Sequence, residues 1–236
     1  MAFLVFQLKA PLASFGVLSG EVRPTELRPR RSAVTGLLAA AKGIRRDEDE
    51  RFSQLGRSFR MACAVLRDPT VLSDFHTIEA PGQRLGTTRR QQLQFSHAVG
   101  KQSNTVVTRR DYLQDGRWLI ALHGAAEALE DLKQALERPA FTLYLGRKSC
   151  ALSAFTAPAI LEASSVEAAL SDWLAQFSTS LQVPVVDVAT LLWEPGVPCE
   201  LALLLERRRL DNRTRLSVNT FGGRTEYEAT LKFKVR

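Results

Sequence analysis

The chain has 236 residues, enough for one large domain or two small ones with a buried core. Its apolar fraction of 45% is ordinary for a globular protein, and no apolar run approaches the roughly 18 residues of a membrane span. The N-terminus lacks the basic lead of a signal peptide, and three scattered Cys residues show no metal-ligand spacing. We therefore expect a cytoplasmic protein that is not held in a membrane and carries no metal or cofactor.

The net charge of +7 is unevenly distributed along the chain. Residues 149–206 contain seven acidic residues and no Lys or Arg, so the excess of positive charge lies elsewhere. This division predicts a basic face for a polyanion, of which nucleic acid is the usual example, and a separate acidic region. A general richness in Arg, without a polyanionic partner, is the alternative.

The first predicted elements are a buried strand and a helix with charged ends. Ala2–Lys9 is rich in β-formers and apolar, which predicts a central strand. Ala33–Lys42 contains good helix formers, with Ser32 placed to cap its start and Gly43 to end it in a left-handed turn. One side of this helix is apolar and is expected to be buried, through Val34, Leu37, Leu38 and Ala41.

Cations gather at both ends of this helix. A helix N-terminus attracts anions by about 0.3–1 kcal/mol per charge, and clustered arginines strengthen such a site. The pattern predicts phosphate binding, and the alternative is a surface helix with solvated arginines. The residues that we expect to contact phosphates here are Arg23, Arg30, Arg31, Ser32 and Arg46.

A long basic segment follows two further strands, predicted at Phe59–Arg67 and Val71–Ile78 after a short helix at 51–59. Residues 84–110 contain six cations and no acid, and Val106–Tyr112 is again strand-like. Such an excursion predicts a β-hairpin that touches a phosphate backbone, with Arg109 and Arg110 at its root. His76 is expected to be a structural histidine, with an RNA contact as the alternative.

Trp118–His123 is predicted to be a strand, and the amphipathic segment Ala125–Glu137 a helix. A strand at Phe141–Leu145 would then lead into Gly146. The next two residues are cations, and a Gly with two cations after a strand is a plausible phosphate cradle. These cations are Arg147 and Lys148.

The order of these elements is βαββαβ, which predicts an α+β fold with a ferredoxin-like, RRM-type domain. We place this domain at 1–152, with a hairpin insertion at about 79–111. Residues 153–236 are expected to form an α/β extension rich in strands. Its predicted parts are a helix at Val166–Phe177, strands at Val183–Leu192, Cys199–Glu206 and Thr225–Val235, and turns at Asp211-Asn212 and Phe221–Gly223.

Several of these segments resemble the CasD family of the type I-E CRISPR complex Cascade. The pattern R-P-T-x-x-x-P-x-R-S-x-x-x-G-L-L is present from Arg23 to Leu38, and Y-L-G-R-K-S-C from Tyr144 to Cys150. D-F-H-T-I at 74–78 and T-x-R-x-Y-L at 108–113 are similar to further family motifs. The resemblance covers roughly residues 3–152 well and the remainder loosely.

The resemblance implies an RNA-binding subunit of an antiviral ribonucleoprotein complex. It would bind the 5′ handle of the CRISPR RNA (crRNA), cap the backbone filament and dock the large PAM-reading subunit, meeting target DNA through the complex. The hairpin at 79–111 would be the family's thumb. No catalytic function is expected, because the sequence contains no recognisable catalytic motif.

Two alternatives remain at this point. His97, Lys101 and Tyr112 lie in or near the thumb and are the residue types of a metal-independent endoribonuclease, which would process CRISPR repeat RNA. The other alternative is an RRM-like RNA-binding protein with no part in CRISPR.

Overall fold

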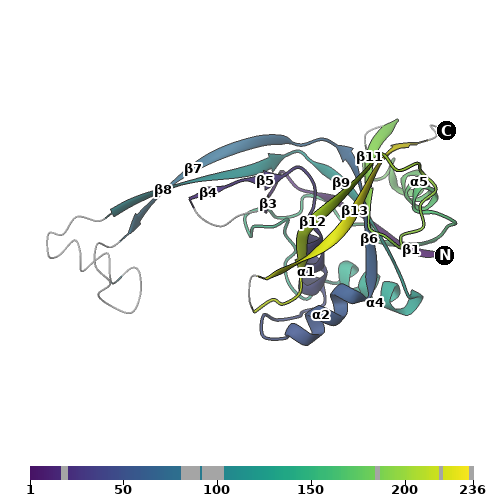
Figure 1. The fold of residues 1–236 in the computed structure, drawn as a ribbon, viewed down its shortest axis with the longest axis horizontal. Helices are drawn as coiled ribbons and strands as arrows, with labels where there is room; N and C mark the ends of the chain where they lie inside the picture. The colour runs from purple at the N-terminus through teal and green to yellow at the C-terminus, as the bar shows by residue number, and fades with distance from the viewer. Residues whose placement is uncertain (17–20, 81–90, 92–103, 184–186, 218–219, 234–236) are drawn as a thin grey trace. The chain divides into compact units, whose positions relative to one another are not determined.

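The computed structural model divides into two compact units. Unit 1 consists of Met1–Phe15, Glu26–Thr70 and Leu113–Arg236, and unit 2 of Gly16–Thr25 and Val71–Tyr112. The structure describes residues 1–16, 21–80, 91, 104–183, 187–217 and 220–233 (Figure 1).

A seven-stranded antiparallel sheet forms the centre of unit 1, in the order β10-β1-β9-β6-β11-β13-β12. Six consecutive residues of β1, Phe3 to Leu8, are buried, because β1 has neighbours on both sides and both of its faces are covered. The strands are β1 (Ala2–Lys9), β6 (Phe59–Arg67), β9 (Arg117–Gly124), β10 (Ala159–Glu162), β11 (Val188–Trp193), β12 (Leu205–Arg213) and β13 (Phe221–Lys232).

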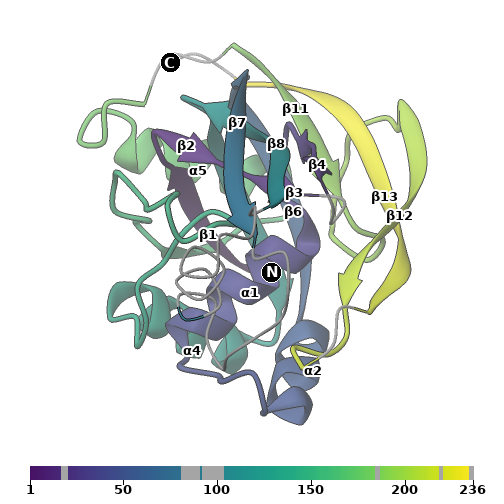
Figure 2. The same ribbon diagram turned by 90° about the vertical axis from the view of Figure 1, so that its left-hand side faces the viewer.

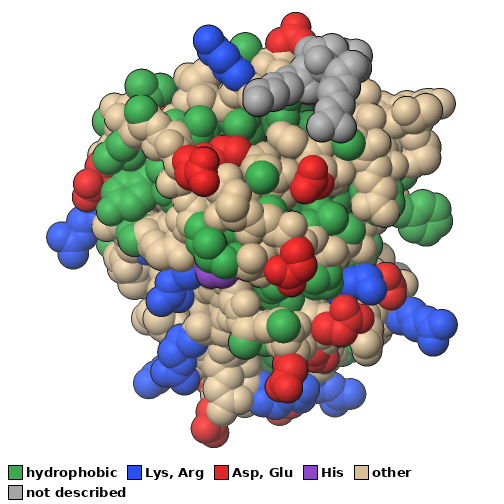
Figure 3. All heavy atoms as spheres, turned by 90° about the vertical axis from the view of Figure 1, so that its right-hand side faces the viewer, with side chains coloured by type: hydrophobic (Ala, Val, Ile, Leu, Met, Phe, Trp, Pro, Cys, Tyr) green, Lys and Arg blue, Asp and Glu red, His purple; other side chains and the backbone are tan. Residues whose placement is uncertain are grey.

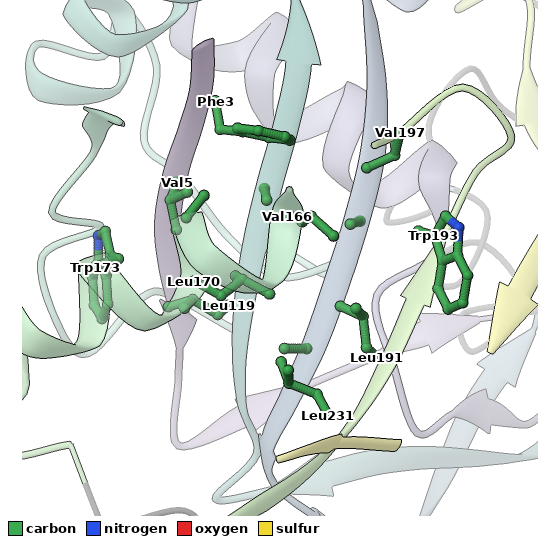
Figure 4. Packing of buried hydrophobic residues seen from close by; sticks show 14 of the residues in the cluster. Phe3, Val5, Leu119, Val166, Leu170, Trp173, Leu191, Trp193, Val197 and Leu231 are labelled. Atoms are coloured by element: carbon green, nitrogen blue, oxygen red, sulfur yellow. The ribbon is translucent and has the colours of Figure 1, made fainter. Parts of the chain in front are cut away.

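Helices cover both faces of this sheet. Helix α5 (Val166–Phe177) packs through Leu170 and Trp173 on alternate residues of the central strands, such as Phe3 and Val5 (Figure 4). Helices α1 (Arg31–Ala41) and α4 (Ala126–Glu137) contact each other, and α4 also contacts β1 and β9. Helix α2 (Asp49–Arg57) lies against β6. The result is a mixed α/β architecture with one large antiparallel sheet.

Several elements lie where the sequence predicted them. Strands β1 and β6 and helix α5 have the predicted bounds, and α4 begins one residue later than expected. Gly43 follows α1 with φ of 68°, the left-handed conformation that ends a helix. The apolar side of α1 is buried as expected.

Five local predictions were wrong. Residues 141–145 form no strand, and the next strand after α4 is β10. Residues 199–204 precede β12, and Asp211 lies inside this strand at a register shift between Arg209 and Asn212. The predicted turn at 221–223 is the start of β13. Helix α1 begins at Arg31, so Ser32 is not its N-cap. The pairing of β12 with β13 decided the conformation of residues 205–213 and 221–223.

Unit 2 contains a small sheet built around β8 (Asn104–Gln114), which continues into unit 1 at Leu113. In unit 2, β8 pairs with β7 (Thr70–Ala80) and, in parallel, with β4 (Val22–Arg23), as Figure 2 shows. The tip of the predicted thumb lies outside the described residues. The remaining short strands are β2 (Leu12–Ala13), β3 (Phe15–Gly16) and β5 (Thr25–Glu26).

Among the described residues, no helix combines the length and the apolar character that crossing a membrane requires.

Candidate nucleic-acid interface

The start of α1, which the sequence predicted as a phosphate site, is in the interior of unit 1. Arg31 is 3% exposed, and its Nη1 donates to both carboxylate oxygens of Glu194, at 2.8 and 2.6 Å. Its Nη2 donates to the carbonyl oxygens of Gly56 and Phe59 at 2.5 and 3.2 Å, and the guanidinium carbon lies 4.7 Å from the centre of the Phe59 ring. A phosphate contact by Arg31 is therefore not supported by its position.

The N-terminus of α1 is also occupied, by a carboxylate from β12. Asp211 is fully buried, and its Oδ2 accepts a hydrogen bond of 3.1 Å from the backbone N–H of Arg31. Arg224 donates to both oxygens of Asp211, at 2.6 and 3.0 Å. Because a negative charge already satisfies this helix end, it has no need of a phosphate.

These residues belong to a larger set of opposite charges, which we call the arginine–carboxylate network. Its ion pairs join the segment that leads into α1 to strands β12 and β13 and to the end of β11. Arg30, for example, donates to the Leu210 carbonyl at 2.8 Å and lies 3.5 Å from Glu26. The network consists of Arg28, Arg30, Arg31, Arg207, Arg209 and Arg224 with Glu26, Glu194, Asp211, Glu226 and Glu228.

The carboxylates of this network were missed at the sequence level. Glu194, the residue that holds Arg31, belongs to the acidic segment that the sequence separated from the basic face. One signal was available: Glu226 and Glu228 alternate along a strand that follows the basic run 207–209. In the structure Arg207 is the register partner of Glu226, and Leu205 that of Glu228.

Acid is expected to destabilise unit 1 through Asp211. Burial by itself would raise the pKa of Asp211, but the hydrogen bonds and charge of Arg224 outweigh it and hold that pKa below its usual value. A carboxylate with a depressed folded-state pKa contributes stability above its unfolded pKa of about 4 and loses it as pH falls through the folded value. We expect the unfolding free energy, measured by urea denaturation, to fall between about pH 5 and pH 2.

Asp211→Asn should make this pH dependence shallower, since it removes the titrating group. The same change at Asp131, an exposed residue paired with Lys42, is a control that should leave most of the dependence in place. An unchanged slope in Asp211→Asn would contradict the assignment.

Arg46 keeps an exposed side chain after α1. Arg213, near the end of β12, is close enough for Arg46 to affect it: burial and then the charge of Arg46 lower the pKa of Arg213. Asp49 accepts hydrogen bonds from the backbone of Leu216 and Ser217, at 2.8 and 3.0 Å, and so ties the chain after β12 to α2. Arg46 is thus a surface cation next to a second one from a distant segment.

In the Gly146–Lys148 loop, the glycine has a structural role. Gly146 has φ of 85°, and a Cβ at this position would lie 1.7 Å from the Ser14 carbonyl oxygen. Hydrogen bonds of 2.8 Å join Leu145 N–H to the Cys150 carbonyl and Cys150 N–H to the Arg147 carbonyl. The close approach that the sequence assigned to a phosphate is made by the backbone of Ser14. Lys148 is exposed, whereas Arg147 is partly buried.

In unit 2, two predicted residues are neighbours on adjacent strands. Arg23 on β4 is the register partner of Arg110 on β8, which brings two cations side by side. The Nε of Arg110 is buried and has no hydrogen-bond partner among the described residues. Two neighbouring arginines, one with an unsatisfied donor, suit an anion with several acceptor oxygens.

Two further predicted residues of unit 2 make contacts with protein side chains. Arg109 donates to Ser73 Oγ at 3.0 Å and lies 3.6 Å from Asp111. The imidazole of His76 contacts the Asp74 carboxylate. His97 and Lys101, from the ribonuclease alternative, lie outside the described residues, and Tyr112 is buried.

One face of the protein shows how its charged side chains are arranged around apolar ones (Figure 3). Figure 3 shows the face on the right-hand side of Figure 1, where α5 lies. Acidic and apolar side chains are interspersed across the middle of this face, and many of its Lys and Arg side chains lie toward its edges. This face carries no continuous basic patch of the kind that binds a nucleic-acid backbone.

Comparison with known proteins identifies the family. The sequence model described as "CRISPR-associated protein (Cas_Cas5)" matches residues 3–228, nearly the whole chain. The chain belongs to the Cas5 family of CRISPR-associated proteins. The CRISPR system Cascade subunit CasD of Escherichia coli (strain K12) is 32% identical over 164 residues, which cover 64% of this chain and 68% of CasD.

Two solved structures share the fold of this Cas5 protein. One is a chain of a structure described as "CRISPR RNA-guided surveillance complex", with a TM-score of 0.64 and 23% identity, covering 99% of this chain and 91% of that one. The other is described as "Crystal structure of Cas protein", with a TM-score of 0.61 and 27% identity over 98% of this chain and 95% of that one. The arrangement of sheet and helices described above is therefore that of solved Cas proteins.

Proposed function

We propose that this Cas5 protein is a Cascade subunit that binds the 5′ handle of crRNA and performs no catalysis. Its place in the Cas5 family and its identity to CasD support membership of such a complex. The backbone filament subunit and the large PAM-reading subunit would be its protein partners, and target DNA would reach it through the complex.

The observation that carries the RNA role is the Arg23–Arg110 pair. Two arginines on adjacent strands concentrate positive charge, which attracts an anion. A phosphodiester offers the acceptor oxygens that the buried Nε of Arg110 lacks. We propose this pair as the main phosphate contact, with Arg46, Arg109, Arg147, Lys148 and His76 as further contacts.

The rest of the predicted site is reassigned. Arg30 and Arg31 hold the start of α1 to the sheet, and Ser32 follows them in the first turn of that helix. We propose that these three residues support the RNA site by keeping the fold rather than by contacting RNA.

We also propose that β1, α1, β6, β9, α4 and β10 form a ferredoxin-like domain. Taken in chain order, the four strands are β1, β6, β9 and β10. In the sheet they lie in the order β10-β1-β9-β6, so the fourth strand is followed by the first, the third and the second. Each neighbouring pair is antiparallel, which is the order that this fold requires.

Arg110→Gln is expected to weaken the retention of guide RNA in the assembled complex. The change removes a cation that faces a phosphate and leaves a shorter, neutral polar side chain. We expect the log–log salt dependence of RNA dissociation to become shallower by about 0.7 for each phosphate that the protein no longer neutralises. Filter binding across a salt series would measure both effects.

Two matched variants make this test specific. Arg57→Gln, at an exposed position on α2, should leave retention unchanged. Arg109→Gln should have a smaller effect than Arg110→Gln, because Ser73 and Asp111 already engage that side chain. Equal retention in all three variants would contradict the site, and metal-independent cleavage of repeat RNA, abolished by His97→Ala, would favour the ribonuclease alternative.

A further inference from the structure

A cavity of about 700 Å³ opens at one end of the large sheet, and none of the residues proposed above for RNA lines it. Strands β1 and β6 end here, at Lys9 and Arg67, and β9 begins at Arg117. All three residues line the cavity. A volume of this size exceeds that of a single inorganic anion and falls in the range of about 300–1,000 Å³ typical of organic ligands.

Arg117 is a buried cation that the described residues leave without a counter-charge. It is 3% exposed, and its hydrogen bonds go to Gln7 Oε1, at 3.0 and 2.5 Å, and to the carbonyl oxygens of Gln182 and Leu181, at 2.9 and 3.1 Å. All of these acceptors are neutral, and no carboxylate in the described part of the chain pairs with Arg117. By contrast, Arg31 and Arg224 each pair with a carboxylate.

The hydrogen bonds of Arg117 also leave one of its N–H donors without an acceptor among the described residues. A guanidinium has five N–H groups, and the bonds above use four of them. The second N–H of Nη1 has no acceptor among the residues that the structure describes. A buried charge that is neither paired nor fully hydrogen-bonded costs folding free energy, unless a ligand supplies the missing acceptor.

The three cations are aligned across neighbouring strands. Lys9 and Arg67 are both register partners of Arg117, one on each side of β9. Antiparallel partners lie about 4.5–5.5 Å apart at Cα, so positive charge is concentrated at this edge of the sheet. Two acids also line the cavity, Asp115, which lies 3.9 Å from Arg67, and Asp187. With three cations and two acids, the lining of the cavity carries one excess positive charge.

The remaining walls suit an organic group attached to the anion. Leu66, Val188 and Pro11 provide apolar surface, and Ser153 and Gln182 provide polar groups. We propose that this cavity binds a nucleotide, with its phosphate against Arg117, Lys9 and Arg67 and its base against the apolar wall. The nucleotide is either free or part of a single strand. This proposal does not depend on handle binding, since none of its residues belongs to the proposed RNA site.

Titration calorimetry of the full chain with adenosine 5′-monophosphate (AMP), adenosine and inorganic phosphate tests the proposal. AMP is expected to bind at least tenfold more tightly than either part. Lys9→Gln and Arg67→Gln, which change exposed side chains and should fold normally, are each expected to weaken AMP binding about fivefold. Arg57→Gln, on α2, is the matched control and should bind as the wild type does.

A second readout locates the ligand. The ¹H–¹⁵N signal of the Arg117 side chain should shift with AMP and not with adenosine. Absence of AMP binding, or binding unchanged in both Lys9→Gln and Arg67→Gln, would overturn the proposal. If inorganic phosphate binds as tightly as AMP does, the cavity is a simple anion site, and the nucleotide proposal is overturned as well.

A short single-stranded oligoribonucleotide distinguishes the two sources of the nucleotide. Competition with AMP would identify the ligand as part of a strand, and AMP binding without competition would identify it as free. Both results support a nucleotide site. Loss of guide RNA retention in Arg110→Gln, with AMP binding unchanged, would separate this cavity from the proposed RNA site.

Discussion

Arg31→Glu is expected to unfold unit 1 rather than to loosen a bound RNA. The new carboxylate would replace the partner of Glu194 and face it in the interior, at a position where the side chain is buried. Breaking a buried ion pair by removing one partner costs about 3–5 kcal/mol, and reversing the charge adds repulsion. Since a domain's whole stability is about 5–15 kcal/mol, urea denaturation should show a large loss or no cooperative transition.

The control for this prediction comes from the same stretch of sequence. Arg45→Glu reverses a charge at an exposed position a short distance beyond α1, and is expected to change the unfolding free energy by less than about 1 kcal/mol. Replacing both Arg31 and Glu194 by Met should recover most of the stability that Arg31→Glu loses, because a well-packed apolar pair avoids the cost of burying charge. If Arg31→Glu unfolds at the same urea concentration as Arg45→Glu, the buried pair is contradicted.

Gly146→Ala is the second change with a large expected effect. The new Cβ would meet the backbone of Ser14 at 1.7 Å, and backbone cannot move aside as a flexible side chain can. The φ of 85° adds the cost of a left-handed conformation, about 1–2 kcal/mol, to overpacking strain of about 1–3 kcal/mol. We therefore expect a loss of about 2–5 kcal/mol of unfolding free energy.

Another glycine separates the two contributions. Gly196 has φ of 89° and nothing within 4 Å of the Cβ position, so Gly196→Ala should cost only the conformational part. Equal losses at Gly146 and Gly196, measured by chemical denaturation, would show that contact with Ser14 is unimportant. A smaller loss at Gly146 than at Gly196 would contradict the close approach itself.

These variants matter because the same residues carried a functional interpretation at the sequence level. Arginines next to a helix start and a glycine next to cations are both typical of phosphate sites. In this chain the first pattern builds an internal ion-pair network, and the second allows two backbone segments to meet. The Arg23–Arg110 pair and the further contacts named under Proposed function are the parts of the predicted site that we still propose to meet RNA.

Local pattern was enough for much of the fold. Continuous apolar β-formers defined β1, and amphipathic spacing defined α4 and α5, because each signal is contained within a few turns or a single strand. The family motifs were equally local, and they identified the family from short segments around Arg23–Leu38 and Tyr144–Cys150.

Tertiary structure alone decided what the charged residues do. Arg31 and Glu194 are 163 positions apart, and no local sequence pattern around either residue predicts that they pair. The pairing of β11, β13 and β12 is what brings Glu194, Asp211 and Arg224 to the start of α1. Because these arginines are buried, they form internal ion pairs instead of being solvated, since a charge removed from water requires a partner. The sequence by itself determined the family, the main helices and the central strands, whereas the assignment of each arginine to the fold or to a ligand depended on that long-range pairing.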